Sequence, residues 1–462
     1  MTKDKGLPGF LAPLVLGNML NPLNSTMLAT AIVSIVAAFK QEPGAGALLI
    51  IPLYFTSAIG QPLMGRLCDV FSPHKINLFG FILILISAFV GISAQSFTWL
   101  IVSRILLGLG SSAAYPSSIT LIKQRYKALN REVPGVALST IAIAGQVSIA
   151  FGPFLGGILV ENFGWKGIFF VNIPLVIIGL LLSIKKKGTL PIKEKVSQKS
   201  AWQVVKDLDP LGLVMFSGFL MLFLLTLLYP TYLYFKIPAM IVVLFLFIKV
   251  ELKHQHPFID VRVLSLNLTL NTTFLRQIGI TFILYLVLYG LPQWMEQSKG
   301  ISPSHVGLIM LPLSLTAMIV SLLLSGNKNY VALLTIGILC IIGASIGLFF
   351  LSKTTSDLMV IVLTVIIGAA LGILTISNQS TLYVAAPDDQ VGVCFGLYRT
   401  VGYIGAIVAG SSLKHEFRQG ATDSGLHMLG LYSLIACIAI VLFMLPLYST
   451  KKSQLTDPIA SN

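Results

Sequence analysis

The chain alternates long apolar runs with short polar segments along its 462 residues. About 20 apolar residues in a helix cross the ~30 Å hydrocarbon core of a bilayer, because a helix rises about 1.5 Å per residue. The pattern therefore predicts fourteen membrane-spanning helices. Six lie at residues 8–37, 46–66, 76–95, 98–121, 135–160 and 167–184, two at 210–229 and 237–250, and six at 273–294, 304–325, 331–351, 358–383, 391–412 and 426–447.

The longest polar interruption separates the first six predicted helices from the other eight. It runs from Lys185 to Asp209 and is rich in lysine. This division predicts an N-terminal six-helix half at 1–184, a basic linker at 185–209, two inserted helices and a loop at 210–272, a C-terminal six-helix half at 273–450 and a tail at 451–462.

Composition agrees with an all-α polytopic membrane protein. Hydrophobic residues make up 55% of the chain and charged residues 10%, which leaves too little polar surface to cover a soluble globule of this length. The net charge of +14 does not indicate nucleic-acid binding, because the basic residues are scattered in the short segments between apolar runs. Most of the 31 Lys and Arg fall in segments on the same side of the membrane as the N-terminus, which predicts that both termini are cytoplasmic. We expect a multi-pass protein of the plasma membrane.

Metal and enzyme chemistry find no support in the sequence. The four Cys have no CxxC spacing, the six His form no HExxH pattern, and no GxSxG turn occurs. We therefore expect no metal or other cofactor and no enzymatic activity.

Glycines recur on one side of the fifth predicted helix. Gly145, Gly152, Gly156 and Gly157 follow helical spacings of seven and four, which predicts a face on which another helix approaches to backbone contact. Pro153 lies among them and predicts a kink, because it lacks a backbone donor.

These residues carry a family resemblance. The segment Gly152–Gly157, GPFLGG, resembles the GPxxGG antiporter motif in the fifth helix of major facilitator superfamily exporters. The turn that follows resembles the WR..F..N.P turn of their 14-helix drug:proton antiporter branch, through Trp165, Lys166 in place of Arg, Phe169, Asn172 and Pro174. The resemblance implies two six-helix halves with two extra helices inserted between them. In line with such repeats, Gly108 and Gly110 of the fourth predicted helix are echoed by Gly368 and Gly372 of the twelfth.

The loop after the second predicted helix resembles the superfamily's GxLxDRxGRxx loop. Gly65, Leu67 and Asp69 are kept, whereas the arginines of the pattern are lost. The resemblance implies that Asp69 belongs to a conformational latch, and a plain interfacial charge is the alternative.

Two arginines within predicted helices are further candidates for a proton-coupling or conformational role. An arginine inside the membrane costs at least ~2.5 kcal/mol unless it finds a partner or water. Arg104, with Gly108 and Gly110, resembles the family's RxxxGxG motif, which implies proton handling or helix ordering; a snorkelling structural residue is the alternative. Arg399 resembles the R..G..G pattern of the branch, and Arg276, near a helix end, is predicted to snorkel.

A buried acid is missing where the family has one. Asn24 stands at the acidic position of a segment that resembles the LDxT motif, and none of the 17 Asp and Glu falls in the middle third of a predicted helix. Carriers that exchange protons for cations usually keep such an acid, because a proton and a cation can then compete for one charge. Glu296 is the best remaining candidate, and a rim charge paired with Lys299 is the alternative.

Amides and phenols within the predicted helices suit a large amphiphilic ligand between the two halves. The candidate substrate-binding residues are Asn21, Asn24, Tyr54, Tyr115, Gln146, Tyr289, Gln293, Asn378 and Tyr403. About half of such side chains are expected to bond neighbouring helices instead.

Taken with the resemblance, these features predict a monomeric efflux carrier that exports amphiphilic drugs or related small molecules in exchange for protons. Its partners would be the substrate, protons and membrane lipids. The missing acids favour neutral, zwitterionic or anionic cargo, for which Arg104 or Arg399 could supply a charge. The alternative is a facilitator or importer of a small metabolite on the same fold, without proton coupling.

Overall fold

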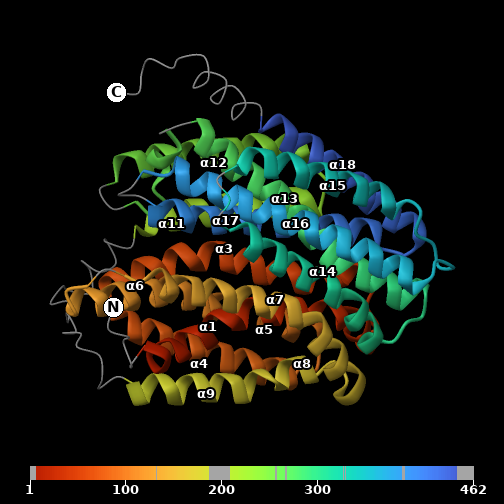
Figure 1. Ribbon diagram of the computed structural model, residues 1–462, viewed down its shortest axis with the longest axis horizontal. Coiled ribbons are helices and arrows are strands. Elements are labelled where there is room, and N and C mark those ends of the chain that lie inside the picture. The colour runs from red at the N-terminus through yellow and green to blue at the C-terminus, as the bar shows by residue number, and fades with distance from the viewer. Residues whose placement is uncertain are drawn as a thin grey trace.

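The computed structural model describes residues 7–131, 133–186, 209–254, 257–265, 268–325, 327, 329–387 and 391–444, and all regular structure within them is helical (Figure 1). The predicted basic linker falls almost wholly outside these residues, as does the predicted tail.

The first six predicted helices form a group that packs on itself, here called the N-terminal bundle. Its central contacts join α1 to α7 and α9, and join α5 to both α3 and α4. The group contains α1 (Leu7–Met27), η1 (Leu28–Thr30), α2 (Ile32–Ala38), η2 (Pro43–Gly46), α3 (Ala47–Val70), α4 (Pro73–Ile92), α5 (Phe97–Ser112), α6 (Ala114–Ala128), α7 (Gly135–Phe163), α8 (Gly167–Phe170) and α9 (Asn172–Lys186).

The last six helices form a second group, the C-terminal bundle, in which α16 packs on α14 and α15 while α13 packs on α17 and α18. It contains α13 (Leu268–Ser298), α14 (Pro303–Leu324), α15 (Tyr330–Leu348), α16 (Asp357–Ala385), α17 (Val391–Glu416) and α18 (Asp423–Leu442). Between the two groups in sequence come α11 (Pro210–Leu228), α12 (Leu233–Lys253) and the short η4 (Val261–Ser265). The α11–α12 hairpin rests on α3 and α17 through α11.

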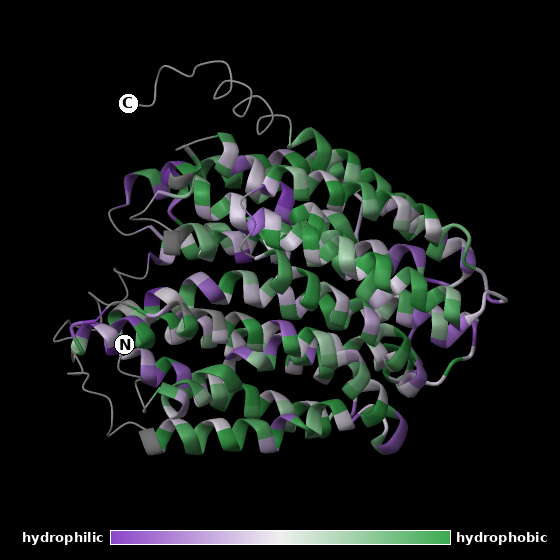
Figure 2. Cartoon of the chain, in the orientation of Figure 1, coloured by the Kyte–Doolittle hydropathy of each residue, from purple (hydrophilic) through white to green (hydrophobic). Residues whose placement is uncertain are grey.

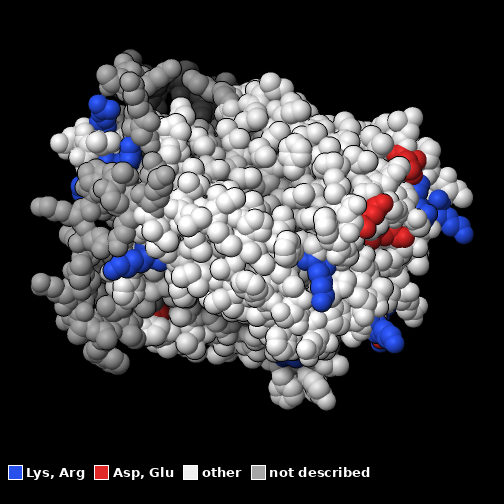
Figure 3. Space-filling model, turned by 90° about the horizontal axis from the view of Figure 1, so that it is seen from below, with Lys and Arg blue, Asp and Glu red and all other residues white. Residues whose placement is uncertain are grey.

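The helices have the length and composition of membrane spans. Twelve of the described helical segments are each long and apolar enough to cross a membrane, and α1 with α2 is long and apolar enough as a bent pair. The remaining helix, α17, is 26 residues long and carries more polar side chains. Apolar residues cover the middle of the helices and polar ones gather at their two ends (Figure 2), while the visible charges leave a broad uncharged band between the ends (Figure 3). The protein is thus an all-α multi-pass membrane protein, and the fourteen-helix prediction accounts for these spans.

The two bundles meet most closely at one end. At one end of the molecule, α1 begins and α3 and α12 end; we call it the linker end. The opposite end, which holds α8, is called the distal end (Figure 1). The bundles touch along α7 with α14 and along α3 with α17, and at the distal end η1, α2 and η2 add contacts to α13, α14 and α17. There, the Glu161 carboxylate accepts from the Ser304 backbone N–H at the start of α14, at 3.2 Å.

The first predicted helix is not a single rod. The chain bends by 64° between Leu7–Thr30 and Ile32–Ala38. Hydroxyls of Thr26 and Thr30 donate back to carbonyls of the preceding turn, Pro22 O at 2.8 Å and Met27 O at 3.3 Å, and such bonds favour helix bending.

Glycines of α7 allow this bent segment to approach. A Cβ atom at Gly152 would overlap the Thr26 hydroxyl, one at Gly156 would lie 2.5 Å from Met27 O, and one at Gly157 would overlap the Pro303 carbonyl of α14. The predicted backbone contact is therefore confirmed for these three glycines, and Pro153 lies inside the same continuous helix. For Gly145 the prediction is wrong, because no atom of the described residues lies within 4 Å of its Cβ position. The close approach is confined to the distal half of α7, where the bend brings α1 and α14 against it.

Glycines also explain the packing within each bundle. A Cβ at Gly108 of α5 would lie 2.6 Å from the Leu53 carbonyl of α3. In the C-terminal bundle, a Cβ at Gly368 of α16 would overlap the Leu313 carbonyl of α14. The fourth span thus lies on the second as the twelfth lies on the tenth.

These contacts predict different effects of one substitution at two glycines. Gly156→Ala should lower the free energy of unfolding by about 1–3 kcal/mol, because the new methyl group meets backbone that cannot yield cheaply. Gly145→Ala faces open space and should leave stability unchanged or raise it by up to about 1 kcal/mol through helix propensity. Thermal unfolding of both variants in detergent measures the difference. Equal stability of the two proteins would contradict the packing described.

Candidate functional site

Four tyrosines meet where the bundles face each other. Tyr54 comes from α3, Tyr285 and Tyr289 from α13, and Tyr403 from α17. The ring of Tyr54 lies 4.7 Å from that of Tyr285 and 5.8 Å from that of Tyr403, measured between centroids. Because Tyr285 and Tyr289 are one helical turn apart, their rings stack with centroids 5.9 Å apart. The cluster offers polarisable aromatic faces from both bundles.

Hydroxyl groups in this cluster join the bundles directly. The hydroxyls of Tyr54 and Tyr289 are 3.2 Å apart, and Tyr289 donates to the Ser25 carbonyl at 2.9 Å. Ser25 lies in the last turn of α1, where carbonyls lack a regular intrahelical partner. The break after α1 therefore creates an acceptor for the opposite bundle.

Arg104 of α5 is buried beside this cluster, with 1% of its surface exposed. Its Nη1 donates to the Asn24 carbonyl at 3.4 Å, and its guanidinium lies 5.7 Å from the centre of the Phe169 ring. Among the described residues, its Nε and Nη2 atoms have no hydrogen-bond acceptor, and no carboxylate pairs with it. Arg104 therefore does not snorkel and presents unused donors inside the protein.

Arg399 of α17 lies one helical turn before Tyr403. Its guanidinium stacks on the Tyr115 ring of α6 at 3.6 Å from the ring centre, a cation–π contact between the two bundles. We use the name tyrosine–arginine site for Tyr54, Tyr285, Tyr289, Tyr403, Arg104 and Arg399. It combines stacking surfaces with two cations and contains no carboxylate.

The buried Arg276 of α13 contrasts with Arg104. Its guanidinium donates to Asn378 Oδ1 at 3.0 Å, Thr273 Oγ1 at 2.7 Å and the Phe443 carbonyl at 2.7 Å. The prediction that it snorkels is wrong. Helix α13 begins at Leu268 rather than at the predicted residue 273, which places Arg276 more than two turns from the helix start.

Glu296 lies near the distal end of α13. Its Oε1 is buried and has no hydrogen-bond partner among the described residues. The alternative prediction of a pair with Lys299 is wrong, because the Lys299 ammonium lies 3.0 Å from Asp357 Oδ1. Glu296 thus has one buried carboxyl oxygen on a side chain that is partly exposed, and it lies on the same helix as Tyr285 and Tyr289 but outside the tyrosine–arginine site.

Several predicted binding residues instead bond neighbouring helices. Asn24 and Asn172 exchange amide hydrogen bonds of 2.6 and 2.7 Å, and Asn21 donates to Ser111 Oγ at 2.7 Å. Asn378 is engaged by Arg276, as described above.

The remaining predicted positions are distributed around the site. Gln293, one turn beyond Tyr289, donates to its carbonyl at 2.8 Å. Gln146 of α7 is partly exposed. The side chain of Asp69, the predicted latch residue, lies outside the described part of the structure.

Three buried or clustered polar residues were not predicted as site residues from the sequence: Tyr285, Asp209 and Glu251. Tyr285 lies four residues before Tyr289, and this spacing could have placed both on one helix face. Asp209 and Glu251 were expected in loops, yet both are buried. No group of three or more His, Cys, Asp or Glu in the described residues could hold a metal ion.

Comparison with known proteins agrees with this architecture. The family model of the Major Facilitator Superfamily matches residues 14–410. The chain is 30% identical to the uncharacterized MFS-type transporter YwoD of Bacillus subtilis, over 94% of this chain and 96% of that protein. It is 28% identical to the riboflavin transporter RibZ of Clostridioides difficile, over 64% of this chain and 62% of the other, and 28% identical to the multidrug efflux pump SdrM of Staphylococcus aureus, over 65% of each.

A solved structure shows the same fold. The crystal structure of a mutant of the nucleoside transporter NupG matches 94% of this chain and 99% of its own with a TM-score of 0.61 at 14% identity. Two helical bundles with a polar, aromatic site between them, a family model spanning most of the chain and relatives that are transporters agree with one another. The chain belongs to the Major Facilitator Superfamily and is a membrane transporter, not an enzyme.

Proposed function

We propose that the protein is a secondary active transporter that exports amphiphilic small molecules in exchange for protons. The tyrosine–arginine site carries this proposal, because it joins aromatic surface to a buried guanidinium with unused donors. An aromatic cargo would stack on the tyrosines, while a carboxylate or phenolate of the cargo would satisfy the unused donors of Arg104. We accordingly favour neutral, zwitterionic or anionic molecules over cations.

Alternating access would follow from rocking of the two bundles about this site. The close contacts at the distal end, between Gly157 and Pro303 and between Glu161 and Ser304, belong to the state described here. The opposite state needs these contacts to break and the linker end to close, and Asp69 and Arg399 are candidates for that switch. With both termini in the cytoplasm, the closed distal end would face the cell exterior.

The direction of transport rests on the relatives and the fifth-helix motif. SdrM is a multidrug efflux pump, and the segment Gly152–Gly157 resembles the antiporter motif of exporters. Its glycines hold α7 against both the bend after α1 and the start of α14. An element in contact with both bundles is well placed to couple their movement. We further propose that the protein works as a monomer in the plasma membrane.

Proton coupling is assigned to Glu296. Its buried oxygen, which has no partner in the described part of the chain, would be costly as an anion and inexpensive as a neutral acid, so that a proton is bound when the group is enclosed. Opening of the distal end would expose the group to water and favour ionisation. Glu296 thus supplies the titrating carboxyl group that the tyrosine–arginine site lacks.

A facilitator or importer of a small metabolite is the second candidate. The absence of a carboxylate from the tyrosine–arginine site favours it, because such a carrier needs no titrating group. RibZ, a riboflavin transporter, shows that a relative of comparable similarity handles a metabolite.

Removing the charge of Arg104 should discriminate among cargo classes. In proteoliposomes, counterflow is measured with three amphiphiles that share one aromatic body and carry a carboxylate, an amide or an amine. For Arg104→Gln we expect a loss of about 10–100-fold for the carboxylate, corresponding to the ~1.5–3 kcal/mol of a hydrogen bond to a charged group, and a much smaller loss for the amide. Arg104→Lys, which keeps the charge, should retain part of the anion transport. Equal losses for all three compounds would show that Arg104 orders helices only.

Replacing Glu296 should separate exchange from proton movement. Wild-type proteoliposomes with an imposed pH gradient are expected to accumulate cargo and to change their lumenal pH. Glu296→Gln should still exchange cargo across the membrane but should neither accumulate it nor move protons. Asp357→Asn is the matched control, since this acid is 40% exposed and pairs with Lys299. If wild-type protein moves cargo equally with and without the gradient, the facilitator assignment replaces the antiporter.

A further inference from the structure

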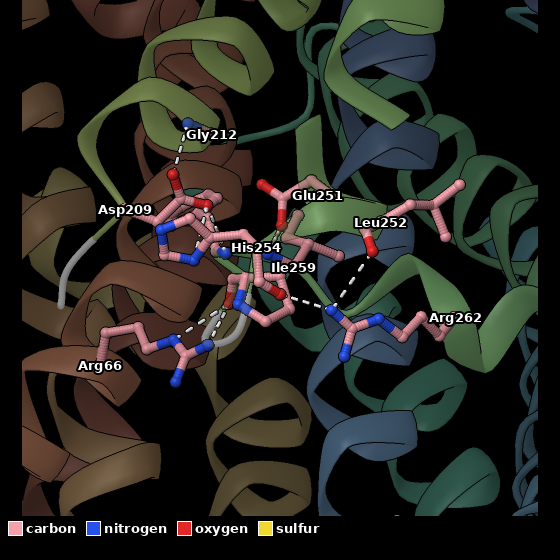
Figure 4. Close-up of polar contacts among 10 residues, drawn as sticks. Arg66, Asp209, Gly212, Glu251, Leu252, His254, Ile259 and Arg262 are labelled. Carbon is pink, nitrogen blue, oxygen red and sulfur yellow. Dashed lines mark hydrogen bonds and ion pairs between the residues drawn. The ribbon is translucent and has the colours of Figure 1, made fainter. Parts of the chain in front are cut away.

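Two carboxyl groups are buried at the linker end, where the α11–α12 hairpin meets α3 (Figure 4). Asp209 caps the start of α11 and is 1% exposed, and Glu251 lies in the last turn of α12 and is 0% exposed. Neither belongs to the tyrosine–arginine site. Two buried charges of the same sign need an explanation, because each is costly without a partner.

The two side chains converge on one point. A Cβ atom placed on Gly212 would overlap Glu251 Oε1 and lie 2.5 Å from Asp209 Oδ2. Carboxylates this close cannot both be ionised without a strong penalty. One of the two must therefore hold a proton when the site is closed.

The hydrogen bonds show where that proton belongs. Asp209 accepts two backbone N–H groups at 3.0 Å, from Gly212 through Oδ1 and from Phe258 through Oδ2. Glu251 Oε2 accepts from Ile259 N–H at 3.3 Å, whereas Glu251 Oε1 has no donor among the described residues. An ionised Glu251 would leave a buried anionic oxygen unsatisfied, while a protonated one can donate from Oε1 to Asp209.

We propose that Asp209 and Glu251 form a buried proton-binding site that fastens the α11–α12 hairpin to the N-terminal bundle. The proton is carried on Glu251 Oε1 and donated to Asp209 Oδ2. The site lies in the inserted helices and does not depend on which cargo the transporter moves.

The backbone of residues Pro257–Ile259 is bonded by side chains from three parts of the chain (Figure 4). The Pro257 carbonyl accepts from Arg66 Nε of α3 at 3.1 Å, the Phe258 N–H is taken by Asp209, and the Ile259 N–H is taken by Glu251. The backbone groups of these three consecutive residues are thus hydrogen-bonded by an arginine of α3, the aspartate at the start of α11 and a glutamate of α12. The chain then continues through η4 into α13, the first helix of the C-terminal bundle. We call this segment, Pro257–Ile259, with its three side chains the carboxyl clip.

The surrounding charges fit a singly protonated pair. Arg66 and Asp209 are the charged groups that act on Glu251, so that one proton leaves one negative charge facing one guanidinium. His254 Nδ1 lies 3.9 Å from Asp209 Oδ2 and is partly exposed. Arg262, which is exposed, donates to the Leu252 and His254 carbonyls, and its backbone N–H donates to Asp260 Oδ1.

Loss of the proton would open the carboxyl clip. Two adjacent carboxylates would then share the charge of Arg66, and their repulsion would pull one away from the backbone group that it holds. Because the closed form is the protonated form, docking of the hairpin is present at lower pH and is lost as the pH rises. The site therefore makes the attachment of α11 and α12 to α3 sensitive to proton concentration.

Infrared difference spectroscopy of the full-length protein in nanodiscs tests the shared proton. At neutral pH the wild type should show the carbonyl stretch of a protonated carboxylic acid that is absent from Glu251→Gln. Asp209→Asn should lose the same band, because Glu251 then has an amide donor beside it and no competing carboxylate, and ionises. Asp357→Asn is the matched control and should keep it, since this acid is 40% exposed and pairs with Lys299. Glu296 would give a band of its own, so the proposal is overturned if Glu251→Gln removes no protonated-acid band. It is also overturned if the band lost in Glu251→Gln persists in Asp209→Asn, because Glu251 would then be an isolated acid and not one partner of a shared proton.

Thermal unfolding against pH gives an independent measurement of the fastening. Wild-type protein should lose melting temperature as the pH is raised from about 4.3, the ordinary pKa of a glutamate in an unfolded chain, through neutrality, because the unfolded chain releases a proton that the folded chain keeps. The melting temperature of Glu251→Gln should fall less over the same pH range, because the new amide can donate to Asp209 and accept from the Ile259 N–H at every pH. Identical pH dependence of the two proteins would contradict the carboxyl clip, even if both fold.

Discussion

The hydrocarbon core of a bilayer offers no hydrogen bonds, so every polar group that enters it must be satisfied by the protein. Most of this architecture can be understood from that constraint. Asn24 and Asn172 satisfy each other, and Thr26 and Thr30 return their hydroxyl protons to the helix backbone. Glycines then let the helices approach closely enough for dispersion forces to act where no hydrophobic driving force exists between helices in lipid.

Against this background, the two buried arginines of the bundles differ in kind. Arg276 uses its donors on Asn378, Thr273 and a backbone carbonyl, and is a structural element of the C-terminal bundle. Arg104 keeps two nitrogens without an acceptor among the described residues, at the surface between the bundles. The described residues therefore leave the desolvation cost of this guanidinium uncompensated.

The helices themselves follow from the sequence, because apolar length and glycine spacing are local properties. Contacts of individual polar residues do not, since they depend on helix ends that shift by a few residues and on partners far away in the chain. Helix α12 continues to Lys253, beyond the predicted end at 250, and this extension carries Glu251 into a buried position. Asn24 and Asn172 are 148 residues apart, and no spacing rule joins them. Gly145 has the right period but no neighbour in the described structure, because periodicity gives the face of a helix and not the presence of a partner on it.

The α11–α12 hairpin faces the membrane over most of its surface. Only 17% of the α11 span and 6% of the α12 span are buried inside the protein, so their surroundings are mostly lipid chains. With 19 and 21 residues they measure about 28–32 Å, whereas α13 with 31 residues measures about 46 Å. A change in bilayer thickness therefore demands a different tilt from the hairpin than from the bundles. That mismatch acts on the contacts that hold the hairpin to the bundles, the Pro257–Ile259 connection among them, which makes acyl-chain length a physical variable of this transporter.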